Sequence, residues 1–279
     1  MAKLIMSKSI NLLYLLIGLM TLATMTFSLS KSHAALEDGL VAAWTFDDGT
    51  AKDQVGKNHG KIIDGVKPID GKFGKAMSFD GAKDSHITIP SSKDLEQDTT
   101  FTVSAWWYVR QGRNHSGIWK GEKVGWGPNF HFRMVTTSNT GMTWGVCWAG
   151  TEGWFATDNV MKPGEWYHAA QVVDGKDRKQ AIAYVNAKVP PSAQTNPKPI
   201  VLPLLTFPKE PLEMGVGRGV GGTVGNDTYF DGIIDEVYFW NRALSEAEVK
   251  DLADGKRPSL PVTPGGKLAT AWGFIKIDN

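Results

Sequence analysis

The segment from Tyr229 to Ala253 constrains the fold of this chain more than any other part of the sequence. Polar and apolar residues alternate along its first half, which predicts one long strand. The alternation places Asp231, Ile233 and Asp235 on one face of the strand and Ile234, Glu236 and Tyr238 on the other. Asn241 and Arg242 then end the strand.

A short helix is predicted directly after this strand. Ser245 and Glu248 have the spacing of a capping box, in which each side chain accepts a hydrogen bond from the other residue's backbone N–H. Leu244 precedes the cap and Val249 occupies the fourth helical position, the arrangement of a hydrophobic staple. Gly255 is a natural end for the helix.

Residues 1–34 have the pattern of a secretory signal peptide. Lys3 and Lys8 form a basic start, an apolar run from Ile10 to Leu22 follows, and Ser32–Ala34 offers the small residues that a signal peptidase needs. We therefore expect cleavage after Ala34, export to the periplasm, the cell surface or the medium, and no membrane span thereafter. The alternative is an uncleaved membrane anchor.

The charge and cysteine content of the remaining chain exclude several functions. Removing three leader lysines leaves 27 basic and 29 acidic side chains, a net charge of −2. This balance gives no sign of binding to nucleic acid or to an anionic membrane. Cys147 is the single cysteine, so the chain forms no internal disulfide, and a disulfide-free exported domain suits a bacterial host. About 245 residues are enough for one large core.

Short alternating segments separated by turn signals predict an all-β sandwich. They lie at residues 101–109, 129–135, 142–148, 166–173, 181–185 and 212–216. Pro190 to Pro211 contains seven prolines and is predicted to be a long surface connection. We divide the mature chain into a domain at 35–255 and a Pro/Gly linker with a strand-like tail at 256–279. The tail is predicted to be either an extra edge strand or a secretion or attachment tag.

Five segments of the chain carry recognisable signatures: Gly39–Asp47, Gly71–Gly81, Phe101–Trp106, Gly164–His168 and Phe230–Glu248. In this order they resemble laminin G-like jelly-roll domains, which are relatives of the concanavalin A-like lectins and glucanases. The resemblance covers roughly Leu40 to Leu252 and implies a two-sheet antiparallel jelly-roll sandwich with one short C-terminal helix. It says little about the ligand, because fold does not settle function.

The residues that catalytic relatives use are not matched here. Glucanases of this fold carry E-x-D-x-(x)-E on one strand, with the acids on one face. In the comparable strand Ile233 stands where an acid is required, and Asp235 and Glu236 are predicted to point to opposite faces. Cys147 lies in an apolar strand, and His168 is expected to be structural. We therefore predict a non-catalytic protein, with a glycoside hydrolase or lyase as the least favoured alternative.

Jelly-roll relatives often hold a structural calcium ion where the first and last strands meet. The resemblance implies Asp47 and Asp235 as its ligands here, with Asp48 and Asp53 as nearby alternatives. Calcium takes six to eight oxygen ligands, and two carboxylates do not complete that shell. The alternative is that Asp47 caps a turn and Asp235 pairs with a surface base.

Aromatic residues beside glycines suggest a ligand-binding surface. Trp119, Trp126 and Trp154 have this context and are predicted to be exposed, where they can stack on sugar rings. His131 and Arg133 supply polar groups nearby, and His131 is predicted to point away from its two phenylalanine neighbours. We predict recognition of an extracellular glycan. The alternative is a protein-interaction or structural component of a cell surface or matrix, because exposed tryptophans also serve protein interfaces.

Overall fold

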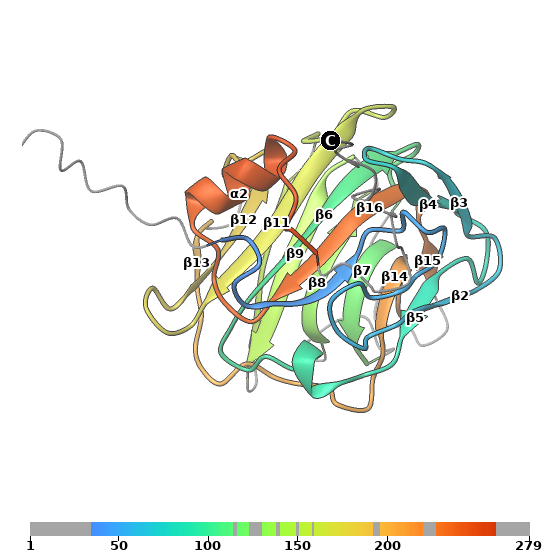
Figure 1. The fold of residues 1–279 in the computed structure, drawn as a ribbon. Helices are drawn as coiled ribbons and strands as arrows, with labels where there is room; N and C mark the ends of the chain where they lie inside the picture. The colour runs from blue at the N-terminus through green and yellow to red at the C-terminus, as the bar shows by residue number, and fades with distance from the viewer. Residues whose placement is uncertain are drawn as a thin grey trace, which may run out of the picture. The chain divides into compact units, whose positions relative to one another are not determined.

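The computed structural model describes residues 35–113, 116–122, 130–137, 140–148, 151–157, 159–191, 196–219 and 227–260. These residues form two antiparallel sheets and one α-helix, which confirms the predicted sandwich (Figure 1). The predicted signal peptide (1–34) and the tail beyond residue 260 lie outside the described residues. In the described part of the chain, no helix has the length and apolar character to cross a membrane.

The first sheet has the strand order β13-β12-β11-β6-β16-β4-β3, with β1 also paired to β16. Its strands are β1 (Leu40–Trp44), β3 (Lys67–Asp70), β4 (Lys75–Asp80), β6 (Thr100–Val109), β11 (Trp166–Asp174), β12 (Gln180–Val185), β13 (Lys198–Pro199) and β16 (Asp231–Trp240). The long strands β6, β11 and β16 form its centre. Three of the five signature segments, those at 101–106, 164–168 and 230–248, thus contribute strands that lie side by side.

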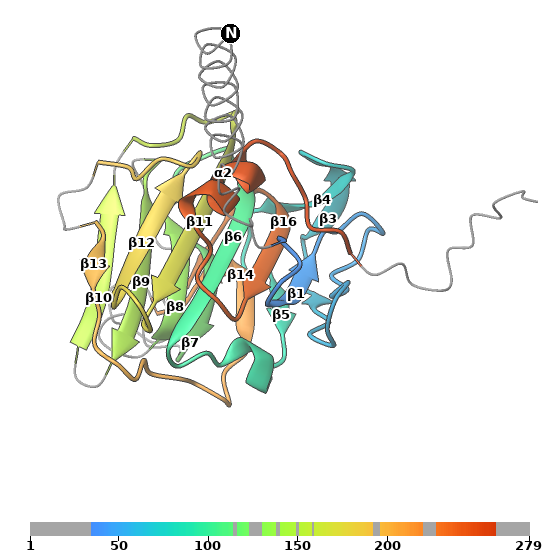
Figure 2. The ribbon, with the colours of Figure 1, turned by 60° about the vertical axis from the view of Figure 1, so that its left-hand side comes forward.

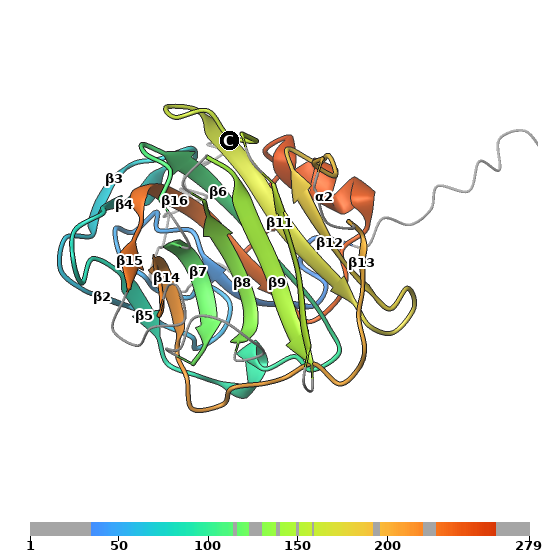
Figure 3. The same ribbon diagram turned by 180° about the vertical axis from the view of Figure 1, so that it is seen from behind.

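The second sheet has the order β10-β9-β8-β7-β14-β5-β2, with β15 paired to β14 (Figure 3). Its strands are β2 (Lys61–Ile62), β5 (Ile87–Ile89), β7 (Ser116–Gly121), β8 (Phe130–Thr136), β9 (Met142–Trp148), β10 (Thr151–Thr157), β14 (Leu212–Gly217) and β15 (Thr228–Tyr229). A 3-10 turn, η1 (Lys93–Leu95), precedes β6. Strands β10 and β13, at the edges of the two sheets, lie close together (Figure 2).

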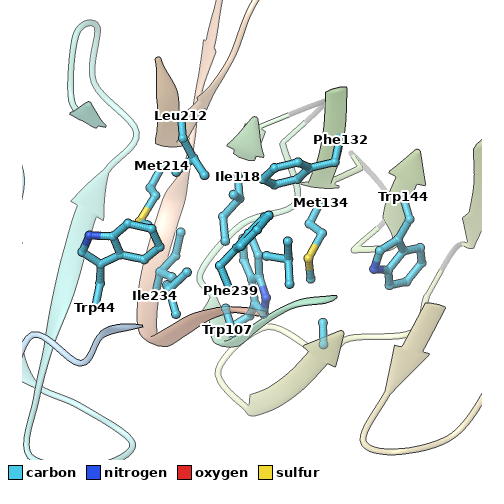
Figure 4. Close-up of a cluster of buried hydrophobic side chains, with 14 of the residues drawn as sticks. Trp44, Trp107, Ile118, Phe132, Met134, Trp144, Leu212, Met214, Ile234 and Phe239 are labelled. Carbon is cyan, nitrogen blue, oxygen red and sulfur yellow. The ribbon is translucent and has the colours of Figure 1, made fainter. Parts of the chain in front are cut away.

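The main core fills the space between the two sheets (Figure 4). It contains Trp44, Trp107, Ile234 and Phe239 from the first sheet and Ile118, Phe132, Met134, Trp144, Leu212 and Met214 from the second. Each of these side chains is at most 1% exposed. Burying one large apolar side chain contributes about 1.5–3 kcal/mol, so this layer is a major source of the domain's stability. Cys147 is buried, as predicted.

A bulge interrupts the last strand, β16. Its first half pairs with β4 and its second half with β1, and its register against β6 shifts between Asp235 and Tyr238. Glu236 adopts a φ of 51° within this shift. A bulge inserts an extra residue, so the side chains beyond it change faces. Ile234 therefore lies in the main core, whereas Tyr238 lies on the opposite face. The prediction that these two residues lie on the same face of the strand is therefore wrong.

Helix α2 (Glu246–Ala253) packs on the outer face of the first sheet, over β11 (Figure 2). The predicted capping box is confirmed: Ser245 N donates to Glu248 Oε2 over 2.7 Å, and Glu248 N donates to Ser245 Oγ over 3.3 Å. Leu244 and Val249, the predicted staple, are both buried in one cluster with Trp240 and Tyr238. Gly255 lies just after the helix, as predicted, and its φ of +90° is the left-handed conformation in which glycine commonly ends a helix.

The first residues of the predicted linker pack against the sandwich. Pro258 is buried, and Leu260 packs against the cluster beneath helix α2. Ser259 N donates to Glu37 Oε1, and Arg257 reaches carboxylates on two different segments. Residues 256–260 therefore pack as part of the domain, although the proline and glycine content of the stretch from Lys256 to Lys267 predicts a linker.

Candidate functional site

Five residues form a row across the outer face of the second sheet. Backbone pairing aligns Trp154 with Gly145, Gly145 with Arg133, Arg133 with Trp119, and Trp119 with Glu213. Strand alternation explains why the row faces outward, because the sequence neighbours of these residues point into the main core. The core neighbours include Ile118, Phe132, Met134, Trp144, Val146, Leu212 and Met214. The structure thus brings three of the predicted site residues onto one line.

Trp119 is buried, so the prediction that it is exposed is wrong. Its side chain is 1% exposed, and its ring centroid lies 5.3 Å from that of Phe130. With Val135 and Cys147 these two rings form a small apolar cluster that is separate from the main core, and Leu205 packs against it. Strand β7 is central in its sheet, and this cluster covers its outer face as well. The indole Nε1 is buried without a hydrogen-bond partner.

Arg133 connects this buried cluster to the edge of the sheet. Its Nη2 lies 2.7 Å from Glu152 Oε1 on β10, and its guanidinium lies 4.5 Å from the ring centroid of Phe130. Burial lowers the pKa of Arg133, and the adjacent Glu152 carboxylate opposes that shift. Gly145 keeps room for the guanidinium, because a Cβ at this position would lie 3.2 Å from Arg133 Nε. That Nε atom is buried without a partner.

His131 is predicted to supply a polar group to the ligand-binding surface, but its side chain does not reach solvent. It is fully buried, and its Nδ1 lies 2.7 Å from the carbonyl oxygen of Leu205. Its ring lies 5.1 Å from the ring of Phe101 and 5.4 Å from that of Phe132. Burial lowers the pKa of His131 to about 4, so the ring is neutral near pH 7. It holds the loop that contains Leu205 against the sandwich.

Trp154 is the predicted aromatic residue that remains partly exposed. It lies on β10, which pairs only with β9 among the described strands. Glu152 is two residues away on the same strand and the same face, and its side chain is 15% exposed. Trp126 lies outside the described residues. A partly exposed indole beside a partly exposed carboxylate therefore forms the accessible end of the row.

The other end of the row is a charged network that sequence reasoning missed. Arg218 Nη1 lies 2.6 Å from Asp227 Oδ2, and Arg218 Nε donates to Glu213 Oε2 over 2.6 Å. His86 Nε2 lies 3.7 Å from Glu213 Oε1. Arg218 follows β14 in a glycine-rich stretch, which gives no signal of a buried guanidinium. The one available hint is Glu213, an acid within an otherwise apolar strand.

The carboxylates on this face do not have the spacing of a glycosidase pair. Glu152 and Glu213 are four strands apart, which is about 19 Å at ordinary strand spacing. Glycosidase acids lie about 5–9.5 Å apart. Glu213 and Asp227 are closer together, but Arg218 lies between them and pairs with both. Among the described residues, no pair of acids at this end of the row is therefore free to act on a substrate bond.

A second cluster contains the predicted calcium ligands, Asp47 and Asp235. Asp235 is buried, and its Oδ2 accepts a hydrogen bond from Phe73 N over 3.0 Å. Burial, with a smaller contribution from the charge of Asp47, raises the pKa of Asp235 to about 7 against the backbone hydrogen bonds that lower it. Burial also raises the pKa of Glu236 to about 8, with Arg257 opposing and Asp235 adding to the shift. The bulge thus brings Asp235 and Glu236 into one electrostatic cluster, where strict alternation predicted opposite faces.

Arg257 supplies the positive charge in this second cluster. Its Nη2 lies 2.7 Å from Asp47 Oδ2 and 2.5 Å from Glu236 Oε1. Asp47 Oδ1 also accepts a hydrogen bond from Lys75 N over 3.2 Å. No group of three or more His, Cys, Asp or Glu side chains in the described ranges is placed to hold a metal. As these side chains lie, they fit an arginine–carboxylate network rather than a calcium shell, and calcium stays an untested prediction.

A family model supports the resemblance seen in the sequence. The model described as the concanavalin A-like lectin/glucanases superfamily matches residues 80–250. This range extends from the end of β4 into helix α2, and it contains every residue of the row. A comparison with curated protein sequences finds no match.

Solved structures share the fold. Domain 4 of AbnA, an extracellular GH43 arabinanase from Geobacillus stearothermophilus solved in complex with arabinotriose, has a TM-score of 0.50 and 23% identity, over 77% of this chain and 98% of that one. The binding domain of Paraclostridial Mosquitocidal Protein 1 has a TM-score of 0.58 and 16% identity, over 77% and 52%. A structure of botulinum neurotoxin type C, whose cell entry depends on two ganglioside molecules, has a TM-score of 0.56 and 9% identity, over 78% and 51%. The match therefore spans about half of each toxin chain, and these identities establish the fold alone.

Proposed function

Because the chain belongs to the concanavalin A-like lectin/glucanases superfamily, we propose that it is an exported, non-catalytic module that binds extracellular carbohydrate on the outer face of its second sheet. The observation that carries this proposal is the accessible end of the row. There, the half-buried indole of Trp154 lies beside the partly exposed carboxylate of Glu152, which Arg133 holds from below.

The chemistry of these groups suits a sugar ring. An indole offers a broad apolar face that can pack on the C–H side of a pyranose or furanose. A carboxylate accepts hydrogen bonds from hydroxyl groups, and charge-assisted bonds of this kind are stronger than neutral ones. The pairing of Arg133 with Glu152 fixes the carboxylate in place, so less side-chain entropy is lost when a ligand binds.

Two further observations support binding without catalysis. Among the described residues, the carboxylates at the two ends of the row are either too far apart for glycoside hydrolysis or neutralised by Arg218. The similar arabinanase domain was solved with arabinotriose, and cell entry of the similar neurotoxin depends on gangliosides. These relatives are consistent with a fold that presents carbohydrate-binding surfaces, although the identities are too low to transfer a ligand.

A glycan array tests the proposal. The chain from Ala35 to Asn279 is screened against plant, microbial and animal glycans, together with Trp154→Ala and, as a matched control, Trp166→Ala. Trp166 is also half-buried, but it lies on the other sheet and stacks near Tyr108. We expect specific signals that Trp154→Ala removes and Trp166→Ala keeps. A blank array for the unmodified protein would point instead to recognition of a protein partner.

A further inference from the structure

A surface hollow lies at one end of the second sheet, outside the row. It has a volume of about 310 Å³ and is lined by Glu122, which follows β7, and by the loop Thr206–Glu210. Phe207 is half-buried in this loop, and Pro208 beside it is exposed. The hollow thus combines an aromatic ring and a proline ring with the carboxylates of Glu122 and Glu210.

The loop that forms the hollow is fixed from below by a buried lysine. Lys120 is fully buried, and its Nζ donates to the carbonyl oxygens of Phe207 over 3.2 Å and Glu210 over 2.7 Å. The same Nζ lies 2.5 Å from Glu96 Oε1, and Glu96 Oε2 accepts a hydrogen bond from Phe207 N over 2.8 Å. Both ends of the turn are therefore attached to the sandwich, which makes the hollow a preformed feature.

The charges that line the hollow select among ligands. Glu122 and Glu210 supply two negative charges and Lys209 supplies one positive charge, so the lining is net negative. Carboxylates accept hydrogen bonds from sugar hydroxyls, whereas they repel acidic sugars such as sialic or uronic acids. An aromatic ring with two acceptors beside it suits a neutral sugar unit.

The loop that forms the hollow reaches the face of the sheet that carries Trp154. Leu205, next to the hollow, packs against the cluster around Trp119, and its N–H donates to the carbonyl oxygen of Cys147 over 2.7 Å. Cys147 pairs with Glu152, which is two residues from Trp154. At ordinary strand spacing and rise, the hollow and Trp154 are about 10–20 Å apart. A single sugar unit cannot contact both places.

We infer that Trp154 and the hollow at Thr206–Glu210 are two subsites for one extended, neutral oligosaccharide. This inference rests on the proposed function. It makes the affinity depend on chain length, because only a ligand of several units occupies both subsites at once. It also assigns Phe207 a binding role that no sequence pattern suggested.

Titration calorimetry with defined oligosaccharides tests the inference. The probes are arabino-, xylo- and cello-oligosaccharides from disaccharide to hexasaccharide, with sialyllactose as an acidic probe. We expect affinity for at least one neutral series to rise with length, and sialyllactose to bind more weakly than that series. Phe207→Ala is expected to lower the affinity for the longest probe by roughly threefold to tenfold and to leave disaccharide binding unchanged. Phe207→Tyr, which keeps the ring, is expected to restore the affinity.

Other outcomes separate this inference from the proposed function. If Trp154→Ala removes binding but Phe207→Ala binds every length like the unmodified protein, the second subsite is wrong and the proposed function stands. Tighter binding of sialyllactose than of any neutral probe would also overturn the inference. If the unmodified protein binds no glycan on the array, the proposed function and this inference fail together. Thermal melting of each variant checks that the fold is intact.

Discussion

At the scale of single residues, buried charge on the second sheet is concentrated in a few contacts that pair an arginine or a lysine with a carboxylate. Arg133 is 1% exposed, and the guanidinium meets a single carboxylate, that of Glu152. Because removing one member of such a pair leaves the other charge without its partner, these contacts are sensitive to mutation even where the pair adds little net stability. Glu152 is partly hydrated, which limits the penalty on its side.

Replacing Arg133 by Leu is expected to lower the free energy of unfolding by about 1–3 kcal/mol, because it removes charge-assisted contacts and leaves Glu152 unpaired. Urea denaturation followed by fluorescence measures this change. Glu152→Gln serves as the comparison: it keeps a hydrogen-bond acceptor beside Arg133 but leaves the buried cation without a counter-charge. A stability of Arg133→Leu equal to that of the unmodified protein would show that the pair is not formed in solution.

The buried titratable groups predict how stability depends on pH. Asp235 and Glu236 have pKa values raised by burial to about 7 and 8, against ordinary values of 3.8 and 4.5. Their contribution is fully present below the ordinary values and is lost as the pH rises through the raised ones. Burial lowers the pKa of His131 to about 4 and that of His168 to about 3, against 6.5. The contribution of these histidines is present above pH 6.5 and is lost as the pH falls below it.

Between about pH 4.5 and 6 the two contributions change in opposite directions and nearly cancel, so we expect the melting temperature to be highest near pH 5–6 and to fall on both sides. The decrease in melting temperature up to pH 8–9 is caused by the two carboxyl groups, because the two histidines are neutral in both the folded and the unfolded state in that range. Melting curves of the double variant Asp235→Asn, Glu236→Gln provide the check, since this variant should lose most of the alkaline fall. An unchanged alkaline limb in that variant would contradict the assignment.

At the scale of elements, helix α2 depends on its first turn. Ser245 and Glu248 satisfy each other's backbone N–H groups, and Arg242 Nη2 adds a 2.6 Å contact to Glu248 Oε1. An eight-residue helix is too short to be stable alone, so the cap and the buried face over β11 both matter.

Ser245→Ala is expected to lower the free energy of unfolding by about 1 kcal/mol. The variant has no hydroxyl to accept the hydrogen bond from Glu248 N, so the capping box is broken. Denaturant titration measures the loss, and Ser245→Thr, which keeps the hydroxyl, should recover most of it. Equal losses for the alanine and threonine variants would mean that the capping hydroxyl is not the source of the lost stability.

The helix and the strands also show which features can be predicted from the sequence alone. The capping box, the staple and the alternation up to Asp235 are local patterns, so the strand–helix unit was predictable residue by residue. The bulge at Glu236 was not, because a change of register depends on how β16 pairs with β1, β4 and β6. The burial of Trp119 was missed for a similar reason: its strand is covered on both faces, and the covering residues come from distant segments.

At the scale of the whole molecule, the segment after helix α2 joins the start and end of the sandwich. Arg257 pairs with Asp47, which follows β1, and with Glu236 in β16. The structure places a guanidinium at the junction where the family resemblance implies a calcium ion, and that ion stays an untested prediction. A proline- and glycine-rich stretch gave no hint of this role, because the ion pairs are formed with residues about 20 and 210 positions earlier.

Metal removal distinguishes the two accounts of this junction. If Arg257 provides the positive charge, EDTA leaves the melting temperature unchanged and Arg257→Ala lowers it. Differential scanning calorimetry of the chain from Ala35 to Asn279, with calcium and then with EDTA, measures both effects. A melting temperature that drops in EDTA would establish the predicted calcium ion and would contradict the assignment of Arg257 as the cation at this place.

The central claim is that the partly exposed end of the row, at Trp154, binds carbohydrate. Its most direct test is titration calorimetry with the strongest glycan from the array, comparing the unmodified protein with Trp154→Ala and Trp166→Ala. The account predicts that Trp154→Ala loses binding at least tenfold, while Trp166→Ala, on the opposite sheet, keeps it within experimental error. Equal affinities for all three proteins, or a loss confined to Trp166→Ala, would contradict it.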